Sequence, residues 1–224
     1  MNLFVTGTDT EVGKTRVAAA LLHAFAARRL RTVGMKPVAA GCDAQGLNED
    51  VETLCAASSV KAPREWVCPY LFQPPIAPHI AAAEAGVTID LAHIEARYRE
   101  LRTLADVVIV EGVGGWLVPL NARETGADLA RRLGAPVVLV VGMRLGCINH
   151  ALLTQEAILA RGLRLAGWVA NRVDPDMQRT ERNLEALRER LQAPLLADFP
   201  YAPGTASETF AGCFDLSLLN VPAE

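Results

Sequence analysis

The chain has 224 residues, of which 51% are hydrophobic and 21% charged, and its formal net charge at pH 7 is −3. This composition excludes a largely disordered chain, and the acidic balance lacks the clustered basic charge on which nucleic-acid binding depends. No apolar run reaches the ~20 residues that cross a bilayer, and no basic region precedes the first apolar run. We therefore expect a cytoplasmic protein with no signal peptide, no membrane partner and no nucleic-acid partner.

Six short apolar runs predict β-strands, at 2–6, 32–36, 106–110, 136–141, 164–169 and 194–198. Several are apolar at consecutive positions, as expected when helices cover both faces of a parallel sheet. Between them, apolar residues recur at helical spacing over 17–25, 152–160 and 184–191. The alternation predicts a doubly wound, mostly parallel α/β sheet with helices on both faces. Without repeats or low-complexity linkers, we expect one domain over 1–224.

The proline-rich stretch 63–78 interrupts this alternation. Its prolines exclude a regular helix, so we predict a long ordered loop or lid, which in α/β domains is often functional.

The five cysteines are Cys42, Cys55, Cys68, Cys147 and Cys213. Their number is odd and none forms a C-x-x-C pair, which favours reduced thiols over a disulfide framework or a structural zinc site.

A phosphate-binding loop follows the first predicted strand. The stretch 7–15 reads GTDTEVGKT and leads into a helix. Gly13, Lys14 and Thr15 supply the ending of a P-loop, in which backbone N–H groups wrap the phosphates, the lysine neutralises phosphate oxygens and the hydroxyl binds Mg²⁺. Thr8 stands where the standard pattern has its first glycine, so the alternative is a strand–helix turn that merely reads GKT.

Polar or glycine-rich segments also follow the other predicted strands, beginning at Lys36, Glu111, Gly142, Asn171 and Pro200. Ligands of open α/β sheets bind at the carboxyl ends of the strands, so we expect these segments to meet at one edge. Glu111 ends the apolar run VVIV, where a buried carboxylate is costly unless it is paired or binds a metal. With Thr15 and one further acid, it would supply the hard oxygen ligands of Mg²⁺.

Each of these residues also has an ordinary structural interpretation. Lys36 could be a solvated strand-end lysine, and Asp50 an acid in the first turn of a helix. The three glycines of 112–115 could simply turn the chain, or let a ligand press against the backbone. Asn171 could cap a turn, although its amide offers the donor and the acceptor that an adenine edge requires.

Five segments of this sequence resemble the dethiobiotin synthetase family of the biotin pathway: FVTGTDTEVGKT (4–15), KPVAAG (36–41), VEGVGGWLVPL (110–120), LGCINHALLT (145–154) and GWVAN (167–171). The similarity runs from the first strand to about Pro200. The GTDTEVGKT form is far more specific than a generic P-loop. Partitioning-type ATPases carry a signature lysine where this chain has Asp9.

The resemblance implies a homodimeric ligase that depends on ATP and Mg²⁺ and closes a cyclic urea. The implied substrates are ATP, 7,8-diaminononanoate and CO₂ or bicarbonate. One amine takes up CO₂ as a carbamate, and the γ-phosphoryl group of ATP is transferred to the carbamate oxygen. The second amine then attacks the mixed anhydride, which expels phosphate and leaves dethiobiotin.

Carried over by position, the resemblance implies Lys14, Lys36 and Thr10 as catalytic residues, and Thr15, Asp50 and Glu111 as Mg²⁺ ligands. The implied ATP site consists of Glu11, Val12, Gly13, Lys14, Thr15, Arg16, Asp50, Glu111, Gly112, Val113, Gly114, Asn171, Arg172, Pro200, Tyr201 and Ala202. The implied substrate site consists of Lys36, Ala40, Gly115, Gly146, Cys147, Ile148 and Asn149. The turn 146–149 would reach the substrate of the neighbouring subunit.

The chain departs from the family pattern in places. Ala40 replaces a hydroxyl residue that commonly touches the substrate, Arg172 stands where some relatives have an acid, and the similarity is weak after Ala202. Two other classes of function remain open. A nucleotide-switch ATPase of the partitioning or metal-insertion kind would lack Lys36 and the GCIN turn, and a non-enzymatic binding module would be expected to lose the P-loop lysine or its metal ligands.

Overall fold

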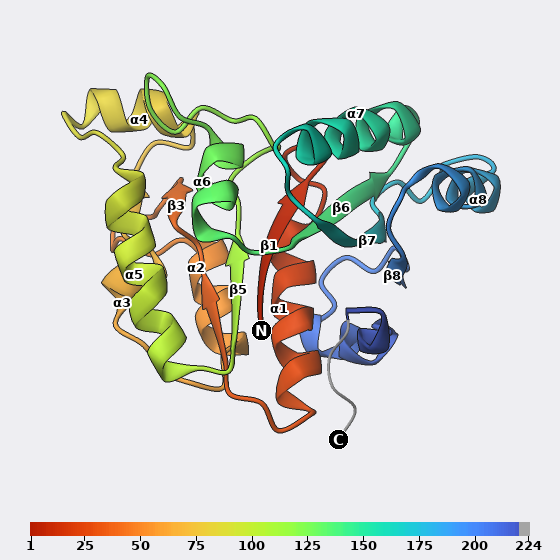
Figure 1. The fold of residues 1–224 in the computed structure, drawn as a ribbon, viewed down its shortest axis with the longest axis horizontal. Helices are drawn as coiled ribbons and strands as arrows, with labels where there is room; N and C mark the ends of the chain where they lie inside the picture. Colours follow the sequence, from red (N-terminus) through yellow and green to blue (C-terminus); the bar gives the residue numbers. More distant parts are fainter. Residues whose placement is uncertain (220–224) are drawn as a thin grey trace.

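The computed structural model describes residues 1–219. Its main sheet has six strands in the order β2-β5-β1-β6-β7-β8, and every neighbouring pair is parallel (Figure 1). The strands are β1 (Asn2–Gly7), β2 (Thr32–Met35), β5 (Val107–Glu111), β6 (Val137–Met143), β7 (Leu165–Arg172) and β8 (Leu195–Phe199). Each coincides with one of the six predicted runs, which confirms the predicted fold class.

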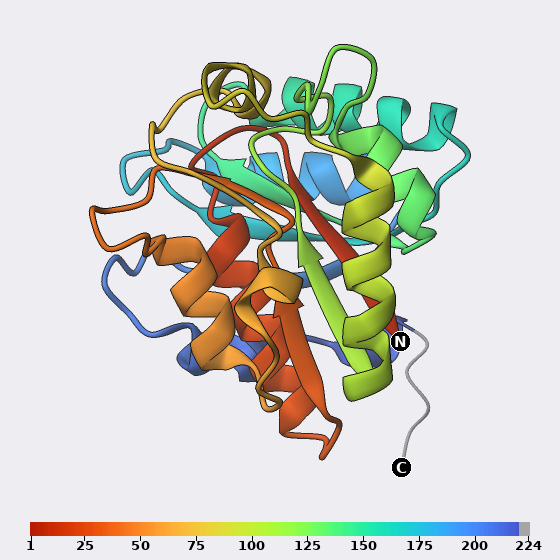
Figure 2. The ribbon, with the colours of Figure 1, turned by 90° about the vertical axis from the view of Figure 1, so that its left-hand side faces the viewer.

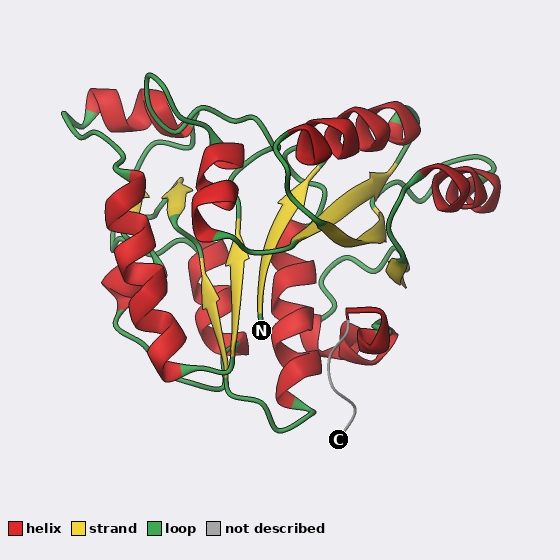
Figure 3. Cartoon of the chain, in the orientation of Figure 1, coloured by secondary structure: helices red, strands yellow, loops and turns green. Residues whose placement is uncertain are grey.

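Two layers of helices cover the sheet. One face carries α1 (Lys14–Ala26), α2 (Glu49–Ala57) and the short 3₁₀ helices η1 (Ser207–Cys213) and η2 (Leu216–Leu219). The opposite face carries α5 (Leu91–Leu104), α6 (Gly126–Leu133), α7 (Cys147–Ala160) and α8 (Thr180–Arg190). Figure 2 shows α1 and α2 on one side of β5 and α5 on the other, and Figure 3 shows the strands enclosed by helices. Within residues 1–219, no helix is both long and apolar enough to cross a membrane.

The double coverage explains why the strands are apolar at consecutive positions. Val108 and Val110 of β5 lie in the same core cluster as Leu101 of α5. Val107 and Ile109 alternate with them and lie in the core cluster that contains the buried side chains of α1. Since both faces of the strand exclude water, neither can carry polar residues.

A second, smaller sheet was not predicted. It pairs β3 (Val38–Ala40) with β4 (Tyr70–Phe72) in parallel. The stretch 63–78 is therefore not one long loop, because it contains α3 (Arg64–Val67) and β4 and ends where α4 (Pro78–Glu84) begins. Its prolines lie next to the ends of these elements or in the turn between β4 and α4, where they break no ladder or helix hydrogen bond. Elements of three or four residues are too short to show a hydrophobic period.

The strand order places the functional residues at one edge. The chain that leaves β1 runs to β2 on one side of the sheet, whereas the chain that leaves its neighbour β6 runs to β7 on the other side, so a crevice opens at the carboxyl end of the sheet beside β1. Met35 of β2 pairs with Val110 of β5, and Val5 of β1 pairs with Glu111. The residue after Met35 is Lys36, so the register brings Lys36 and Glu111 together beside the loop that follows β1.

Candidate functional site

A cavity of about 910 Å³ opens at the carboxyl edge of the main sheet. The predicted site residues among its lining are Thr10, Glu11, Gly13, Lys14, Thr15, Arg16, Lys36, Ala40, Asp50, Glu111, Val113, Gly114, Asn171, Arg172 and Tyr201. They come from six separate parts of the chain, from the phosphate loop to the segment after β8. The expected convergence is therefore present for the segments after β1, β2, β5, β7 and β8, whereas no residue of the segment 142–149 lines the cavity.

Backbone geometry shapes the phosphate loop. Gly13 has φ 89°, and a Cβ atom there would lie 2.1 Å from Nδ2 of Asn171. Only glycine therefore fits, both for its left-handed conformation and for the close approach of β7. Glu11 also has a positive φ, 59°. Such strained non-glycine residues cluster at binding sites, and Glu11 lines the cavity.

Asp9 ties the phosphate loop to itself and to the segment before α7. Its Oδ1 accepts a hydrogen bond of 2.7 Å from the backbone N–H of Thr10, and its carbonyl accepts one of 2.9 Å from Nζ of Lys14. Its Oδ2 pairs with the Arg144 guanidinium at 2.6 Å. The loop and the turn that precedes α7 are thus linked across 135 positions of the chain.

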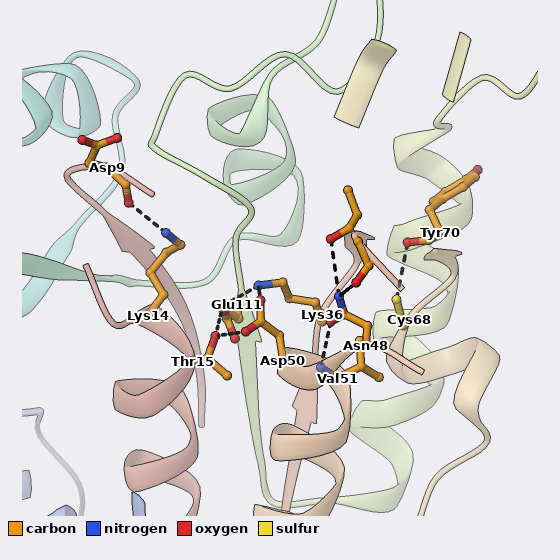
Figure 4. A network of polar contacts seen from close by, with 12 residues as sticks. Asp9, Lys14, Thr15, Lys36, Asn48, Asp50, Val51, Cys68, Tyr70 and Glu111 are labelled. Atoms are coloured by element: carbon orange, nitrogen blue, oxygen red, sulfur yellow. Dashed lines mark hydrogen bonds and ion pairs between the residues drawn. The ribbon is translucent and has the colours of Figure 1, made fainter. Parts of the chain in front are cut away.

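Lys36 lies at the centre of a charged cluster (Figure 4). Its Nζ donates to Oε1 of Glu111 at 2.5 Å and to Oδ2 of Asp50 at 2.7 Å. The hydroxyl of Thr15 lies 2.7 Å from Asp50 and 2.8 Å from Glu111, and its single hydrogen can serve only one of these carboxylates at a time. Two acids, a hydroxyl and an ammonium group therefore converge at one point.

Burial decides the electrostatics of this cluster. Burial alone would lower the pKa of Lys36, but the charges of Glu111 and Asp50 outweigh it, so the pKa is raised and the ammonium form is kept. Burial also raises the pKa of Glu111. No carboxylate within residues 1–219 bonds to Lys14, and burial followed by repulsion from Lys36 lowers the pKa of Lys14 from 10.5 to about 8.

The residues predicted to bind Mg²⁺ fit a hard divalent cation. Thr15, Asp50 and Glu111 present three oxygens at one place, which are the ligands that Mg²⁺ prefers. Oε2 of Glu111 is buried and has no hydrogen-bond partner in residues 1–219, so it has acceptor capacity to spare. Within residues 1–219, no group of three or more His, Cys, Asp or Glu side chains is arranged to hold a metal ion.

The part of the cavity that Asn171 and Arg172 line suits a nucleoside base. The side-chain amide of Asn171 donates to the Val12 carbonyl at 2.8 Å, which fixes the amide orientation. Its Oδ1 is buried without a hydrogen-bond partner among the described residues, so an acceptor is available there. The guanidinium of Arg172 is held by Asp198 and Glu181, each at 2.7 Å, and these two acids raise its pKa. Arg172 stands where some relatives have an acid, and in this chain Asp198 and Glu181 place two carboxylates beside its guanidinium.

Some predicted site residues lie outside the lining of the cavity: Val12, Gly112, Gly115, Pro200, Ala202, Gly146, Cys147, Ile148 and Asn149. Gly112 packs against the ring of Phe4, so its small size serves core packing, and a pressing ligand is not needed to explain it. The turn 146–149 begins α7, where Gly146 is the N-cap with φ 93°. It does not line the cavity of its own chain.

Other residues contribute to the site although the sequence analysis did not single them out. Asn48 caps α2 by accepting from the Val51 N–H at 3.2 Å, and its amide donates to the Gly41 carbonyl at 3.1 Å. It therefore fixes Asp50, two residues further on. Its position before a run of acids is typical of an N-cap and could have been found. The segment 75–78 also lines the cavity; it belongs to the proline-rich stretch predicted as a functional loop, but none of its residues was assigned to the site.

Together, the parallel sheet, the phosphate loop after β1 and the acids beside it define the class of P-loop nucleoside-triphosphate-binding proteins. The chain matches the family model described as "AAA domain" over residues 1–209. The MinD cell division protein of Aquifex aeolicus has the same fold, with a TM-score of 0.59 at 14% identity over 100% of this chain and 98% of that chain. A ParA family ATPase of Chlorobium tepidum has a TM-score of 0.55 at 12% identity, over 97% and 91% of the two chains.

Much higher similarity joins the chain to one family. It is 60% identical to an ATP-dependent dethiobiotin synthetase of Aromatoleum aromaticum, over 90% of this chain and 91% of the relative. It is 55% identical to the enzyme of Nitrosospira multiformis, over 97% and 96%, and 54% identical to that of Pseudomonas paraeruginosa, over 97% of each. The chain belongs to the dethiobiotin synthetase family. The resemblance of its motifs is confirmed, and the alternative of a switch ATPase is not favoured, since the MinD and ParA family proteins share the fold at only 12–14% identity.

Proposed function

We propose that this protein closes the cyclic urea of dethiobiotin in the cavity at the carboxyl edge of its main sheet. ATP is the phosphoryl donor, 7,8-diaminononanoate provides the two amines, and CO₂ or bicarbonate provides the carbon. The observation that carries the proposal is the convergence of Lys14, Lys36, Asp50 and Glu111 beside the phosphate loop in a chain of this family.

The residues suit phosphoryl transfer, in which catalysis is mostly positioning and stabilisation of charge. Lys14, at the start of α1, would contact the β- and γ-phosphates. Lys36 uses two of its three N–H donors on Glu111 and Asp50, which leaves one for a carbamate or phosphoryl oxygen. Thr10 and Glu11 would border the reacting groups, because both line the cavity.

Mg²⁺ would be held by Thr15, Asp50 and Glu111, whose oxygens converge. When bound, the cation neutralises negative charge on the phosphates. The protein holds these ligands in place. The N-cap Asn48 fixes the start of α2, which carries Asp50, and Glu111 is fixed because it belongs to β5.

Asn171 would read the base. With its amide hydrogens directed to Val12, the free Oδ1 accepts a hydrogen bond from the exocyclic amino group of adenine. A base with a carbonyl at the same position would place its oxygen lone pairs against those of Asn171 Oδ1, so such a base would bind poorly. The proposed nucleotide is therefore one with an exocyclic amine, as ATP has.

The turn 146–149 would serve a neighbouring subunit in a homodimer. The backbone N–H groups at the start of α7 suit the carboxylate tail of the diamine. Leu145 is 93% exposed beside this turn and Leu153 of α7 is 57% exposed, as expected of side chains that a partner subunit covers.

Isotope incorporation tests the proposal. Purified protein is incubated with ATP, Mg²⁺, 7,8-diaminononanoate and ¹³C-bicarbonate, and the product is analysed by mass spectrometry. We expect dethiobiotin with one ¹³C atom in the ureido carbon, and none from the Lys14→Ala variant. If the diamine were recovered unchanged from the wild-type reaction, the proposed function would be wrong.

A further inference from the structure

Arg16 is a cation that the proposed chemistry leaves without a defined role. It follows Thr15 in the first turn of α1 and lines the cavity. Its guanidinium forms no ion pair and no hydrogen bond within residues 1–219, although the other arginine in the cavity wall, Arg172, is held by two acids. A half-buried arginine facing a cavity without a carboxylate partner has its charge available for an anion.

An aromatic cluster holds this side chain. The Arg16 guanidinium stands over the ring of Phe210, 5.4 Å from its centroid. Phe210 is buried in η1 and stacks on Phe199 at 4.8 Å, and Phe214 meets Phe199 edge-on at 5.4 Å. The planar guanidinium gains a cation–π contact and loses freedom of movement. In Figure 1, the blue C-terminal segment that contains η1 lies beside α1.

The cluster also anchors the chain that leads to the base end of the cavity. Phe199 ends β8, and the segment between Phe199 and η1 carries Tyr201 and Pro203, which both line the cavity. Arg16 follows Thr15 of the phosphate loop, and it lines the same cavity as Tyr201 and Pro203. In a nucleotide that runs from the phosphate loop to the base, the groups between the β-phosphate and the base are the α-phosphate and the ribose, and of these only the α-phosphate is an anion for a guanidinium.

We propose that Arg16 binds the α-phosphate of the nucleotide and that Phe210 is a positioning residue that aims it. The proposal rests on the proposed function only in taking the ligand to be an adenine nucleotide. It gives the C-terminal 3₁₀ segment a part in nucleotide binding without any contact to the ligand. Phe210 would act only through Arg16.

Binding of ADP, AMP and adenosine to the full-length protein tests this assignment. Calorimetric titration, with displacement of ADP for the weak ligands, gives the three dissociation constants. We expect Arg16→Gln to weaken ADP and AMP about tenfold, as for a lost charge-assisted hydrogen bond, and to change adenosine less than about twofold. The KM for ATP should rise by the same factor while kcat at saturating ATP is unchanged.

Phe210→Leu should weaken ADP and AMP about threefold and leave adenosine unchanged, and the double variant should bind no more weakly than Arg16→Gln. Phe214→Leu is the matched control, because it removes a ring of the same cluster that does not contact Arg16. If Phe210→Leu unfolds, Phe210→Met replaces it, because the flexible Met side chain fills irregular gaps in a core.

Equal losses for adenosine and ADP in Arg16→Gln, or losses that multiply in the double variant, would overturn the assignment. So would a Phe214→Leu variant that weakened ADP as much as Phe210→Leu. If these patterns appeared while no dethiobiotin was formed, the assignment would stand and the proposed function would fail. If dethiobiotin were formed but these binding patterns did not appear, the proposed function would stand and the assignment of Arg16 would fail.

Discussion

Lys36 illustrates how single residues in this site serve stability and function together. Its side chain is 4% exposed, and that of its partner Glu111 is fully buried. A buried charge that loses its partner is strongly destabilising, whereas removal of both partners is often nearly neutral. The cluster beside the phosphate loop is thus a source of stability only while its charges remain paired.

We predict that Lys36→Ala abolishes dethiobiotin formation and lowers the free energy of unfolding by ~3–5 kcal/mol, because Glu111 and Asp50 are left unpaired. The double variant Lys36→Ala/Glu111→Gln should recover much of that stability and none of the activity. Urea unfolding measures the stability of the variants, and the product assay measures their activity. Recovery of activity in the double variant would contradict the catalytic part assigned to Lys36.

Asn171 makes a second prediction at this scale. The wild type should prefer ATP over ITP by at least about tenfold in kcat/KM, since hypoxanthine places a carbonyl against the free Oδ1. Asn171→Ala should lower kcat/KM for ATP, and it should bring the ratio of kcat/KM for ATP to that for ITP towards one. An unchanged ratio in the variant would show that another group reads the base.

Single residues differed in how far the sequence could predict them. Lys36 and Glu111 could be found because each follows an apolar strand, and the ends of parallel strands share an edge. Asp50 looked like any acid in a first helical turn, and only the family pattern assigned it to Mg²⁺. The amide orientation of Asn171 and the acids around Arg172 could not be predicted, because they depend on side chains far away in the chain.

At the scale of elements, an ion pair ties the start of β2 to the start of β5. Asp106 accepts a hydrogen bond from the Arg31 backbone at 2.9 Å and pairs with its guanidinium at 2.8 Å. The side-chain hydrogen bond from Arg31, followed by the backbone one, lowers the pKa of Asp106 from 3.8 to about 2. The ionised carboxylate of Asp106 therefore stabilises the pairing of β2 with β5 above pH 4, and this contribution is lost as the pH falls towards 2.

We predict that Asp106→Asn unfolds at a lower urea concentration than the wild type at pH 7, and that the difference shrinks between pH 4 and pH 2. Denaturation midpoints measured across this range test it. Arg99→Gln, which breaks an exposed pair within α5, is the control. A difference that stayed constant through pH 2 would exclude ionisation of Asp106 as the cause.

The long buried strands were predictable because two covered faces leave no polar positions, and the main helices show a 3.6-residue period. The pairing of β3 with β4 was missed because three-residue strands have no readable pattern. The proline-rich stretch was predicted as one loop because its prolines hide the short elements between them.

At the scale of the whole molecule, the sites are proposed to be shared between two subunits. Each cavity would then need the turn 146–149 of the other chain, which lies outside the cavity of its own chain. An interface of this kind is isologous, so both sites are completed in the same way.

Mixing two inactive variants tests this arrangement. Lys14→Ala disables the phosphate loop, and Gly146→Pro disables the turn by excluding its left-handed N-cap. Refolded together in equal amounts, they should form mixed dimers with one intact site, and recover about one quarter of the wild-type activity. If the mixture stayed inactive while dimers formed, each site would be complete within one chain.

The central claim is that ATP is consumed only to close the ring. The most direct measurement is phosphate release by the purified protein with and without 7,8-diaminononanoate and bicarbonate. We predict negligible release when either is omitted, and one phosphate for each dethiobiotin when both are present. Phosphate release at the same rate without the diamine would contradict the account and would indicate an ATPase that has no small-molecule acceptor.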